Sequence, residues 1–291
     1  MIVALEQIAC PYCGSDDSTL WGEEAGYTAV QCRSCGFVYV NPRPPLEAID
    51  EAAQTGIHTT ERGAANVVSR IGFRRDKVRM FRQRIGALYP DDELRTRPIR
   101  WLDVGTGFGE LPAALEDLVH PASRVEGIEP CLPKVEVAKR RGLRVSPRRL
   151  SAIDDVYHVI SLINVFSHLP DPVAFLGELA QRLEPGGEIV LVTGNGADVP
   201  RDDYPDALCL PDHLVFAGER HIQGLFDRLG FEMVQAHRYR YFLPEPLPYR
   251  AMKNIVKRLQ GRPVSPLRNK GAFRSLFVRA RQVDPLHARR R

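Results

Sequence analysis

Four of the six cysteines stand in two CxxC pairs, and they carry the most sharply defined chemistry in the sequence. Cys10 and Cys13 form the first pair, in CPYCG, and Cys32 and Cys35 form the second, in CRSCG, with 18 residues between the pairs. Each CxxC turn can aim two sulfurs at one point, so two turns together offer the thiolate tetrahedron that zinc prefers. The pattern predicts a structural zinc site with no open coordination position. Disulfides are the alternative, which a cytosolic chain disfavours.

A run of alternating glycines is the second feature with chemical consequences. The stretch is LDVGTGFGE, residues 102–110, and its glycines are Gly105, Gly107 and Gly109. A dinucleotide fingerprint, G-x-G-x-x-G, would place a glycine where Glu110 stands, and Asp103 just before a phosphate cradle would repel the phosphate. The same acid suits a cationic ligand without phosphate, such as S-adenosylmethionine, which carries an ammonium group and a sulfonium. Glu129, in GIEP, could then accept hydrogen bonds from the ribose hydroxyls.

Two of the eight histidines are placed to act as bases. His168 lies in FSHLPDP just after the predicted strand 157–164, and His213 lies in PDHLVF, after the predicted strand 188–194. Both are expected at the mouth of the site. Removing a proton from a hydroxyl or amine acceptor needs a group whose pKa is near neutral. Either histidine could be this base, and packing of the loop is the alternative role for both.

The elements that would position these residues alternate between strands and helices from residue 99 onward. Apolar strands are predicted over residues 99–104, 124–129, 143–145, 157–164, 188–194 and 231–241. Amphipathic helices are predicted over residues 110–119, 133–141, 171–183 and 219–229. This alternation predicts an α/β fold with a doubly wound, seven-stranded, mostly parallel sheet, which binds ligands at the carboxyl ends of its strands. A basic helical insertion at about residues 249–260 and a last antiparallel strand near residues 274–281 would complete the sheet.

The chain divides into three predicted parts. Residues 1–45 are a zinc-ribbon-like subdomain that ends in the Pro-rich NPRPP. Residues 46–98 look mainly helical and form a linker or cap. Residues 99–291 form the main domain, whose basic insertion and last strand occupy about residues 249–291. The ribbon could stabilise the chain only, or it could also cover the substrate or bind a partner.

Taken in order, several motifs resemble those of the class I S-adenosylmethionine-dependent methyltransferases, a Rossmann-like family. They are WLDVGTGFGEL, GIEP, YHVISLINVFSHLPDP and LEPGGEIVLV, between about residues 99 and 241. The ribbon, CGFVYVNPRP and the later DHLVFAGERHIQGLFDRLGF resemble the members that carry an N-terminal zinc-binding segment. Many of those members act on small molecules or sugars in biosynthetic pathways.

The resemblance implies roles for individual residues of this chain. The methionine end of the cofactor would lie against Asp103, Gly105, Gly107 and Asn164, and Thr106 between the glycines would also bind the cofactor. Glu129 would bind the ribose, and Pro130 or Cys131 would lie beside the adenine, which would be held by backbone or by Leu150. The family often places an acid on the adenine after its third strand, and residues 145–153 of this chain, VSPRRLSAI, contain none.

The function expected from this resemblance is methyl transfer to a small natural-product or sugar-like acceptor, by in-line displacement to oxygen without a catalytic metal. Residues 164–167, NVFS, lack the Pro-Pro-aromatic stretch of many amino methyltransferases and the aspartates of magnesium-dependent catechol enzymes. One alternative is an RNA methyltransferase that uses the ribbon and a basic tail, and another is a non-catalytic binding protein that keeps the fold. The sequence specifies neither the acceptor nor the oligomeric state.

Charge is unevenly distributed along the chain, whose net charge is +4. Of the 40 basic side chains, 13 lie from residue 250 onward with a single acid, so residues 1–249 hold 27 basic and 35 acidic side chains. The basic tail could contact nucleic acid or acidic lipid, or form a solvated face. The ribbon, with one arginine and four acids over residues 10–35, does not resemble a nucleic-acid reader. With no apolar run long enough to cross a bilayer and no signal-peptide pattern, a cytoplasmic location is predicted.

Overall fold

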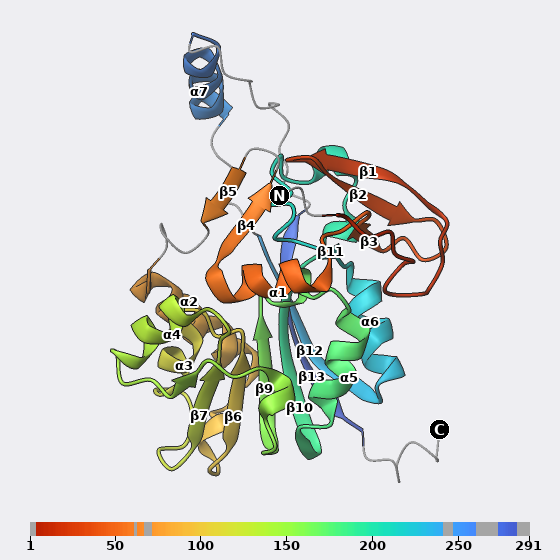
Figure 1. Cartoon of the computed structure of the whole chain (residues 1–291). Coiled ribbons are helices and arrows are strands. Elements are labelled where there is room, and N and C mark those ends of the chain that lie inside the picture. The colour runs from red at the N-terminus through yellow and green to blue at the C-terminus, as the bar shows by residue number, and fades with distance from the viewer. Residues whose placement is uncertain (1–3, 61–62, 67–71, 241–246, 260–272, 284–291) are drawn as a thin grey trace.

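The computed structural model describes the chain except for residues 1–3, 61–62, 67–71, 241–246, 260–272 and 284–291 (Figure 1). Its central sheet has seven strands in the order β12-β13-β10-β9-β6-β7-β8. Their bounds are β6 Arg100–Val104, β7 Arg124–Ile128, β8 Val145–Ser146, β9 Tyr157–Ile163, β10 Leu183–Gly194, β12 Phe231–Arg240 and β13 Arg274–Gln282. Strands β8, β7, β6, β9 and β10 pair in parallel, whereas β13 is antiparallel to both of its neighbours. The predicted seven-stranded, mostly parallel sheet is confirmed.

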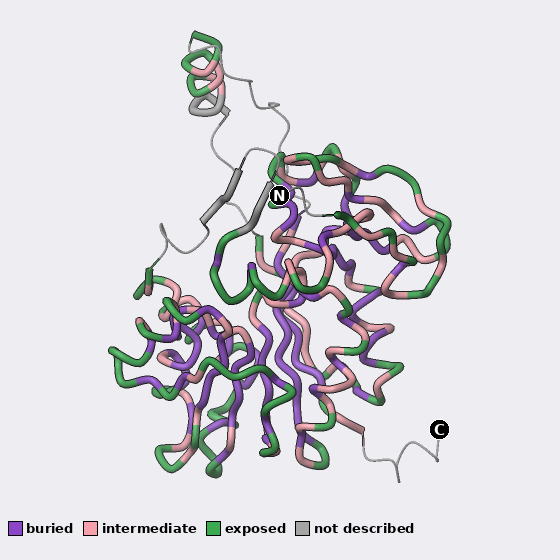
Figure 2. Tube along the Cα trace, in the orientation of Figure 1, coloured by how far each residue is buried: buried purple, intermediate pink, exposed green. Residues whose placement is uncertain are grey.

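Helices cover both faces of this sheet, which explains why its inner strands are apolar on both sides. Trp101, Val159 and Val190 pack with helices α2 (Arg75–Leu88) and α3 (Glu110–Leu115) on one face. Leu102, Ile160 and Leu191 face the other way and pack with helices α5 (Pro172–Ala180) and α6 (Glu219–Arg228). Side chains of a strand alternate between its two faces, so neighbouring residues supply two separate cores. The buried central strands of Figure 2 follow from this arrangement.

A smaller sheet carries the cysteines. Its order is β1-β2-β3-β11, and its strands are β1 Ser18–Glu24, β2 Tyr27–Cys32, β3 Val38–Val40 and β11 Val215–Phe216. Strand β11 follows β10 in the chain, so the main domain completes the sheet of the ribbon. Cys10, Phe37 and Tyr39 belong to the same apolar core as Leu162 and Phe226. The ribbon and the main domain are therefore packed together as one body.

The segment over residues 46–98 differs from its prediction. It contains helices α1 (Leu46–Thr55) and α2, but an antiparallel hairpin of β4 (Ile57–Thr60) and β5 (Gly63–Asn66) lies between them. The sequence IHTT of β4 is rich in β-branched residues, which favour extended backbone. The expectation of a mainly helical segment was therefore incomplete.

Other element boundaries differ by a few residues from those predicted. Asp171 caps α5 as expected, because its Oδ1 accepts a hydrogen bond of 2.9 Å from the backbone N–H of Ala174. Helix α3 ends at Leu115, and β10 begins at Leu183, with an irregularity before Glu188. The remaining helices are α4 Leu132–Lys139, α7 Leu247–Leu259, and the short 3-10 turns η1 Glu93–Arg95, η2 Leu150–Ala152, η3 Phe166–His168, η4 Gly196–Asp198 and η5 Arg201–Asp203. Among the described residues, no helix combines the length and apolarity needed to cross a bilayer.

Candidate functional site

The glycine loop follows β6 at the carboxyl edge of the sheet. Gly105, Gly107 and Gly109 all have positive φ angles, of 67°, 60° and 89°. A Cβ atom at Gly105 would lie 2.4 Å from Val165, and one at Gly109 would lie 2.4 Å from Leu143, whereas one at Gly107 would meet nothing within 4 Å. The first and third glycines therefore allow close packing of the loop, and Gly107 is the position where the backbone faces open space.

A buried carboxylate holds this loop from behind. Asp103 is 2 % exposed, and its two oxygens accept hydrogen bonds of 2.6 Å from the hydroxyls of Ser161 and Thr106. Trp101 Nε1 donates to the Ser161 hydroxyl at 2.9 Å and fixes its position. Burial raises the pKa of Asp103 to about 7, although both hydroxyls oppose the rise. The sequence motif predicted Asp103 at the site. In the structure its carboxylate oxygens accept hydrogen bonds from neighbouring side chains and do not face open space.

A second carboxylate, Glu129, lies where β7 ends. Glu129 is 4 % exposed, and its Oε2 accepts a hydrogen bond of 2.8 Å from the backbone N–H of Gly107. Oε1 accepts one of 3.0 Å from the N–H of Cys131 and lies 3.8 Å from Lys134 Nζ. Glu129 thus lies directly against Gly107, the open glycine of the loop, at the end of the second strand of the main domain, and its ribose-binding role stays a prediction.

The other predicted cofactor residues lie at the ends of neighbouring elements. Pro130 is half-buried after β7, and Leu150 is buried in η2. Asn164 is exposed after β9 and has a φ of 57°, in the left-handed region that asparagine tolerates better than most residues. Because β7, β6 and β9 are parallel neighbours, their carboxyl ends bring Glu129, the glycine loop and Asn164 to one edge.

The histidine cluster consists of His168, Asp212 and His213. His168 Nδ1 lies 3.0 Å from Asp212 Oδ1 and 2.8 Å from the backbone oxygen of Asp212. Both partners are acceptors, so Nδ1 carries a proton and Nε2 is the basic nitrogen. Burial works to lower the pKa of His168, but the bond to Asp212 outweighs it and the pKa is raised. The rings of His168 and His213 meet edge to face, with centroids 5.1 Å apart.

The structure joins two segments far apart in the sequence to make this cluster. The backbone N–H of Leu214 donates to the oxygen of Ser167 at 2.7 Å and holds the two loops side by side. The sequence predicted both histidines here but not Asp212, and its position directly before His213 was the available signal. The three side chains offer ligand atoms within 4.8 Å of one another, so a divalent cation is a second possible occupant.

The four cysteines meet as predicted. The Sγ atoms of Cys10 and Cys35 are 3.7 Å apart, and those of Cys13 and Cys32 are 3.6 Å apart. Four sulfurs at zinc–sulfur distances of about 2.3 Å in a tetrahedron would be about 3.8 Å from each other. The pKa of Cys32 falls to about 7, because hydrogen bonds from backbone N–H groups and neighbouring thiols outweigh its burial. Burial raises the pKa values of Cys10 and Cys35 instead, so Cys32 is the member of the cluster whose pKa shift favours the thiolate. The spacing of the four sulfurs fits a zinc ion.

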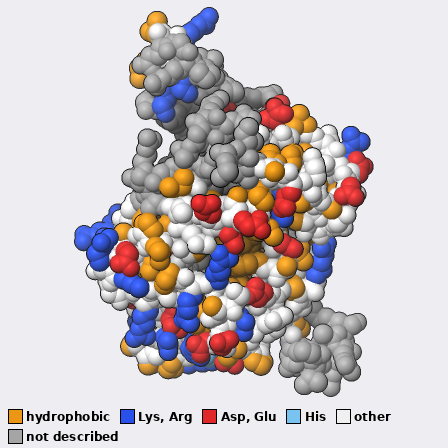
Figure 3. Space-filling model, in the orientation of Figure 1, with side chains coloured by type: hydrophobic (Ala, Val, Ile, Leu, Met, Phe, Trp, Pro, Cys, Tyr) orange, Lys and Arg blue, Asp and Glu red, His pale blue; other side chains and the backbone are white. Residues whose placement is uncertain are grey.

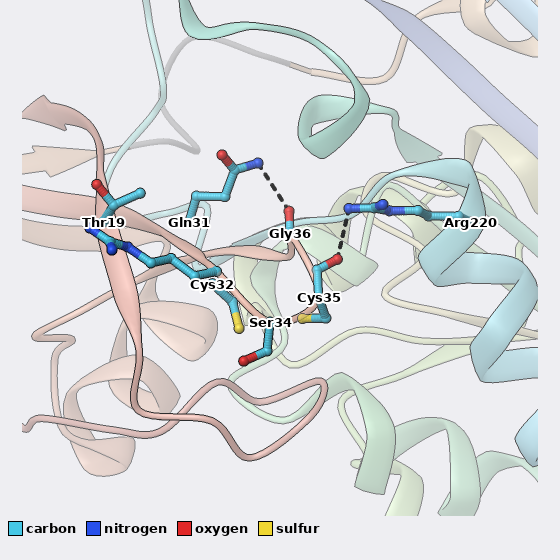
Figure 4. A pocket seen from close by; sticks show the side chains of 8 residues that line it. Thr19, Gln31, Cys32, Ser34, Cys35, Gly36 and Arg220 are labelled. Carbon is cyan, nitrogen blue, oxygen red and sulfur yellow. Dashed lines mark hydrogen bonds between the residues drawn. The ribbon is translucent and has the colours of Figure 1, made fainter.

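A shallow hollow of about 300 Å³ opens beside the second knuckle (Figure 4). Arg220 of α6 reaches across it and donates to the backbone oxygen of Cys35 at 2.7 Å, and Gln31 donates to that of Gly36 at 3.2 Å. His221 Nε2 also lies 3.0 Å from the oxygen of Cys35. The hollow is lined by neither the glycine loop nor the histidine cluster, so it belongs to the contact between the ribbon and α6.

Residues 70–236, more than half of the chain, match a protein family described as a methyltransferase domain. A ubiquinone biosynthesis O-methyltransferase of Parvibaculum lavamentivorans is 30 % identical over 132 residues, which are 42 % of this chain and 52 % of that protein. One of Xanthomonas oryzae pv. oryzae is 30 % identical over 106 residues, 33 % of this chain and 43 % of that protein. The chain thus spans about half the length of the curated relatives that it matches.

Solved structures with a similar chain path are more distant in sequence. Magnesium protoporphyrin IX methyltransferase of Synechocystis PCC 6803, with bound S-adenosylmethionine, has a TM-score of 0.45 and 15 % identity, over 71 % of this chain and 79 % of that one. The cyclopropane synthase MmaA2 of Mycobacterium tuberculosis has a TM-score of 0.48 and 15 % identity, over 70 % and 83 %.

Proposed function

This chain belongs to the methyltransferase-domain family, in its class I form, and from this premise we propose that it transfers a methyl group from S-adenosylmethionine to an oxygen of a small-molecule acceptor. The names of the curated relatives, which are O-methyltransferases of ubiquinone biosynthesis, support transfer to oxygen. Their chemistry favours neither RNA as the acceptor nor a non-catalytic role. A natural-product or sugar-like molecule with a hydroxyl group is the acceptor class that we propose.

The residues at the carboxyl edge fit the cofactor. We assign Glu129 to the ribose hydroxyls and Gly107 to the closest backbone approach, because the loop is open only there. Asp103 acts as a positioning residue, since its oxygens hold Thr106 and Ser161. S-adenosylmethionine, when bound, supplies a methyl group on a sulfonium leaving group.

The histidine cluster supplies the base that the acceptor needs. Asp212 holds the His168 ring with Nδ1 protonated, so that Nε2 can take the proton of the acceptor hydroxyl. The neighbouring carboxylate also stabilises the imidazolium that forms. This contact of 3.0 Å between His168 and Asp212, beside the edge that carries the glycine loop, is the observation on which the proposed reaction rests.

The test measures S-adenosylhomocysteine release with a panel of phenols, catechols and sugar nucleotides. His168→Ala is expected to lower kcat by roughly 10²–10⁴-fold, the usual contribution of a general base, with the cofactor Kd unchanged. His237→Ala is the matched control, because His237 lies on β12 and contacts Gln235 instead.

Three outcomes would contradict the proposal in different ways. Methylation of RNA but of no small molecule would overturn the acceptor class. Activity that requires an added divalent cation, and survives His168→Ala, would replace the base with a metal. A chain that does not bind S-adenosylmethionine would overturn the whole proposal and favour a non-catalytic role.

A further inference from the structure

Helix α7 carries an apolar stripe that none of the described elements covers. Met252, Ile255, Val256 and Leu259 follow the spacing of one helix face, and they are 59 %, 61 %, 47 % and 84 % exposed. The corresponding apolar residues of α6, such as Ile222 and Leu225, are each 1 % exposed because they pack on the central sheet. The stripe of α7 therefore has the residue spacing of a buried helix face, but its side chains are exposed.

The charges on the same helix have one sign. Lys253, Lys257 and Arg258 flank the stripe, and the sequence of α7, LPYRAMKNIVKRL, contains no acid. Figure 3 shows basic and hydrophobic side chains together on the described part of this helix. A basic polar face beside an aliphatic face is the composition of helices that lie in the interface of anionic membranes.

The place of the helix in the fold leaves this stripe available. Helix α7 lies in the connection between β12 and β13, and Figure 1 draws it apart from both large sheets. None of its residues belongs to the apolar cores formed by the described part of the chain. The helix therefore does not contribute to the cores that hold the site.

We propose that α7 binds the surface of an anionic lipid membrane, with its stripe among the acyl chains and its basic side chains at the phosphates. Nucleic acid would satisfy the charges but offers no apolar phase for four aliphatic side chains. A bilayer offers both, and it needs no matching surface shape. Such a helix lies on the membrane and does not span it, and the inference is independent of the reaction proposed above.

The experiment is co-sedimentation of the full chain with sucrose-loaded vesicles. Binding to phosphatidylcholine mixed with phosphatidylglycerol is expected to be at least about tenfold tighter than binding to phosphatidylcholine alone, and to weaken in high salt. The double variant Ile255→Ser/Leu259→Ser should lose at least about tenfold of the binding. Leu20→Ser, at an equally exposed position on β1, should lose none.

A second variant separates charge from apolar contact. Lys253→Gln/Lys257→Gln should reduce binding to anionic vesicles and remove most of its salt dependence. Cofactor affinity and zinc content, measured on every variant, show that each is folded. The proposal is overturned if the wild type does not sediment with anionic vesicles. It is also overturned if the variant Ile255→Ser/Leu259→Ser binds these vesicles as tightly as the wild type does. It is also overturned if the stripe instead mediates a dimer in size-exclusion chromatography, or if the chain is retained by RNA and not by vesicles.

Discussion

The cysteine cluster and the glycine loop are both tight turns that present a ligand site, but different forces hold them in shape. Four thiols converge within 4.8 Å of one another, and a metal ion would join two separate knuckles there. The glycine loop is held by the protein itself, through Asp103 on Thr106 and Glu129 on Gly107. We therefore expect the fold to depend on the metal, and the cofactor site to be formed before the cofactor binds.

Loss of the metal site should lower the stability of the protein more than any other change considered below. Because Cys32 belongs to the core that includes Phe226, Cys32→Ser should abolish zinc binding and also destabilise the main domain. We expect Tm to fall by on the order of 10 °C, since losing even about 3 kcal/mol shifts a domain of this size by roughly 6–12 °C. Metal analysis and calorimetry provide the measurement, and the exposed Cys209→Ser serves as the control. An unchanged Tm in a zinc-free variant would mean that the ribbon folds separately from the main domain.

Two substitutions within the glycine loop sharpen the comparison. Gly105→Ala would drive a methyl group against Val165 at positive φ, so we expect about 2–4 kcal/mol less stability in urea unfolding. Gly107→Ala meets no neighbour and should cost only about 1–2 kcal/mol of stability, while weakening cofactor binding at least about tenfold. If Gly107→Ala left cofactor affinity intact, the open side of the loop would not be the binding side.

Removing the second carboxylate tests the ribose assignment. Glu129→Ala should weaken S-adenosylmethionine binding by roughly 1–3 kcal/mol, because charge-assisted hydrogen bonds are lost. Isothermal titration calorimetry measures the change. Glu136→Ala, on the exposed side of α4, is the control and should leave the affinity unaltered. Equal affinities for the two variants would remove Glu129 from the site.

The smallest expected effect is a shift of the pH profile. His168 acts as a base only when neutral, and Asp212 raises its pKa, so the rate should rise with pH through that raised pKa. In Asp212→Asn the carboxylate that raises the pKa of His168 is gone, so the acidic limb of the pH profile of kcat/KM should move to lower pH. A limb that stays in place would assign the titration to another group.

Much of the fold and the site could be predicted because the signals are local. The apolar run of β9 indicates a buried strand, and the two CxxC pairs indicate a metal site, from a few adjacent residues. Strand β11 has only two residues, and its pairing with β3 joins Val215 to Tyr39, which are far apart in the sequence. Asp212 precedes His213 directly in the sequence, but its partner His168 lies 44 positions away, so the contact between them depends on folding. Asp103 was predicted from the glycine motif, but its hydrogen bond to Ser161 of β9, 58 positions away, was not.

Strand β11 also has a consequence for how this chain can be shortened. Val215 and Phe216 are buried through their pairing with Tyr39 and Val38, which lie in the first forty residues. A fragment beginning at residue 46 would keep β11 but remove β3, the strand that pairs with it. The unpaired apolar strand would then be exposed at the surface, and exposed strand edges promote aggregation. We therefore expect a shortened chain to stay dispersed in solution only if the β10–α6 connection is redesigned together with the truncation.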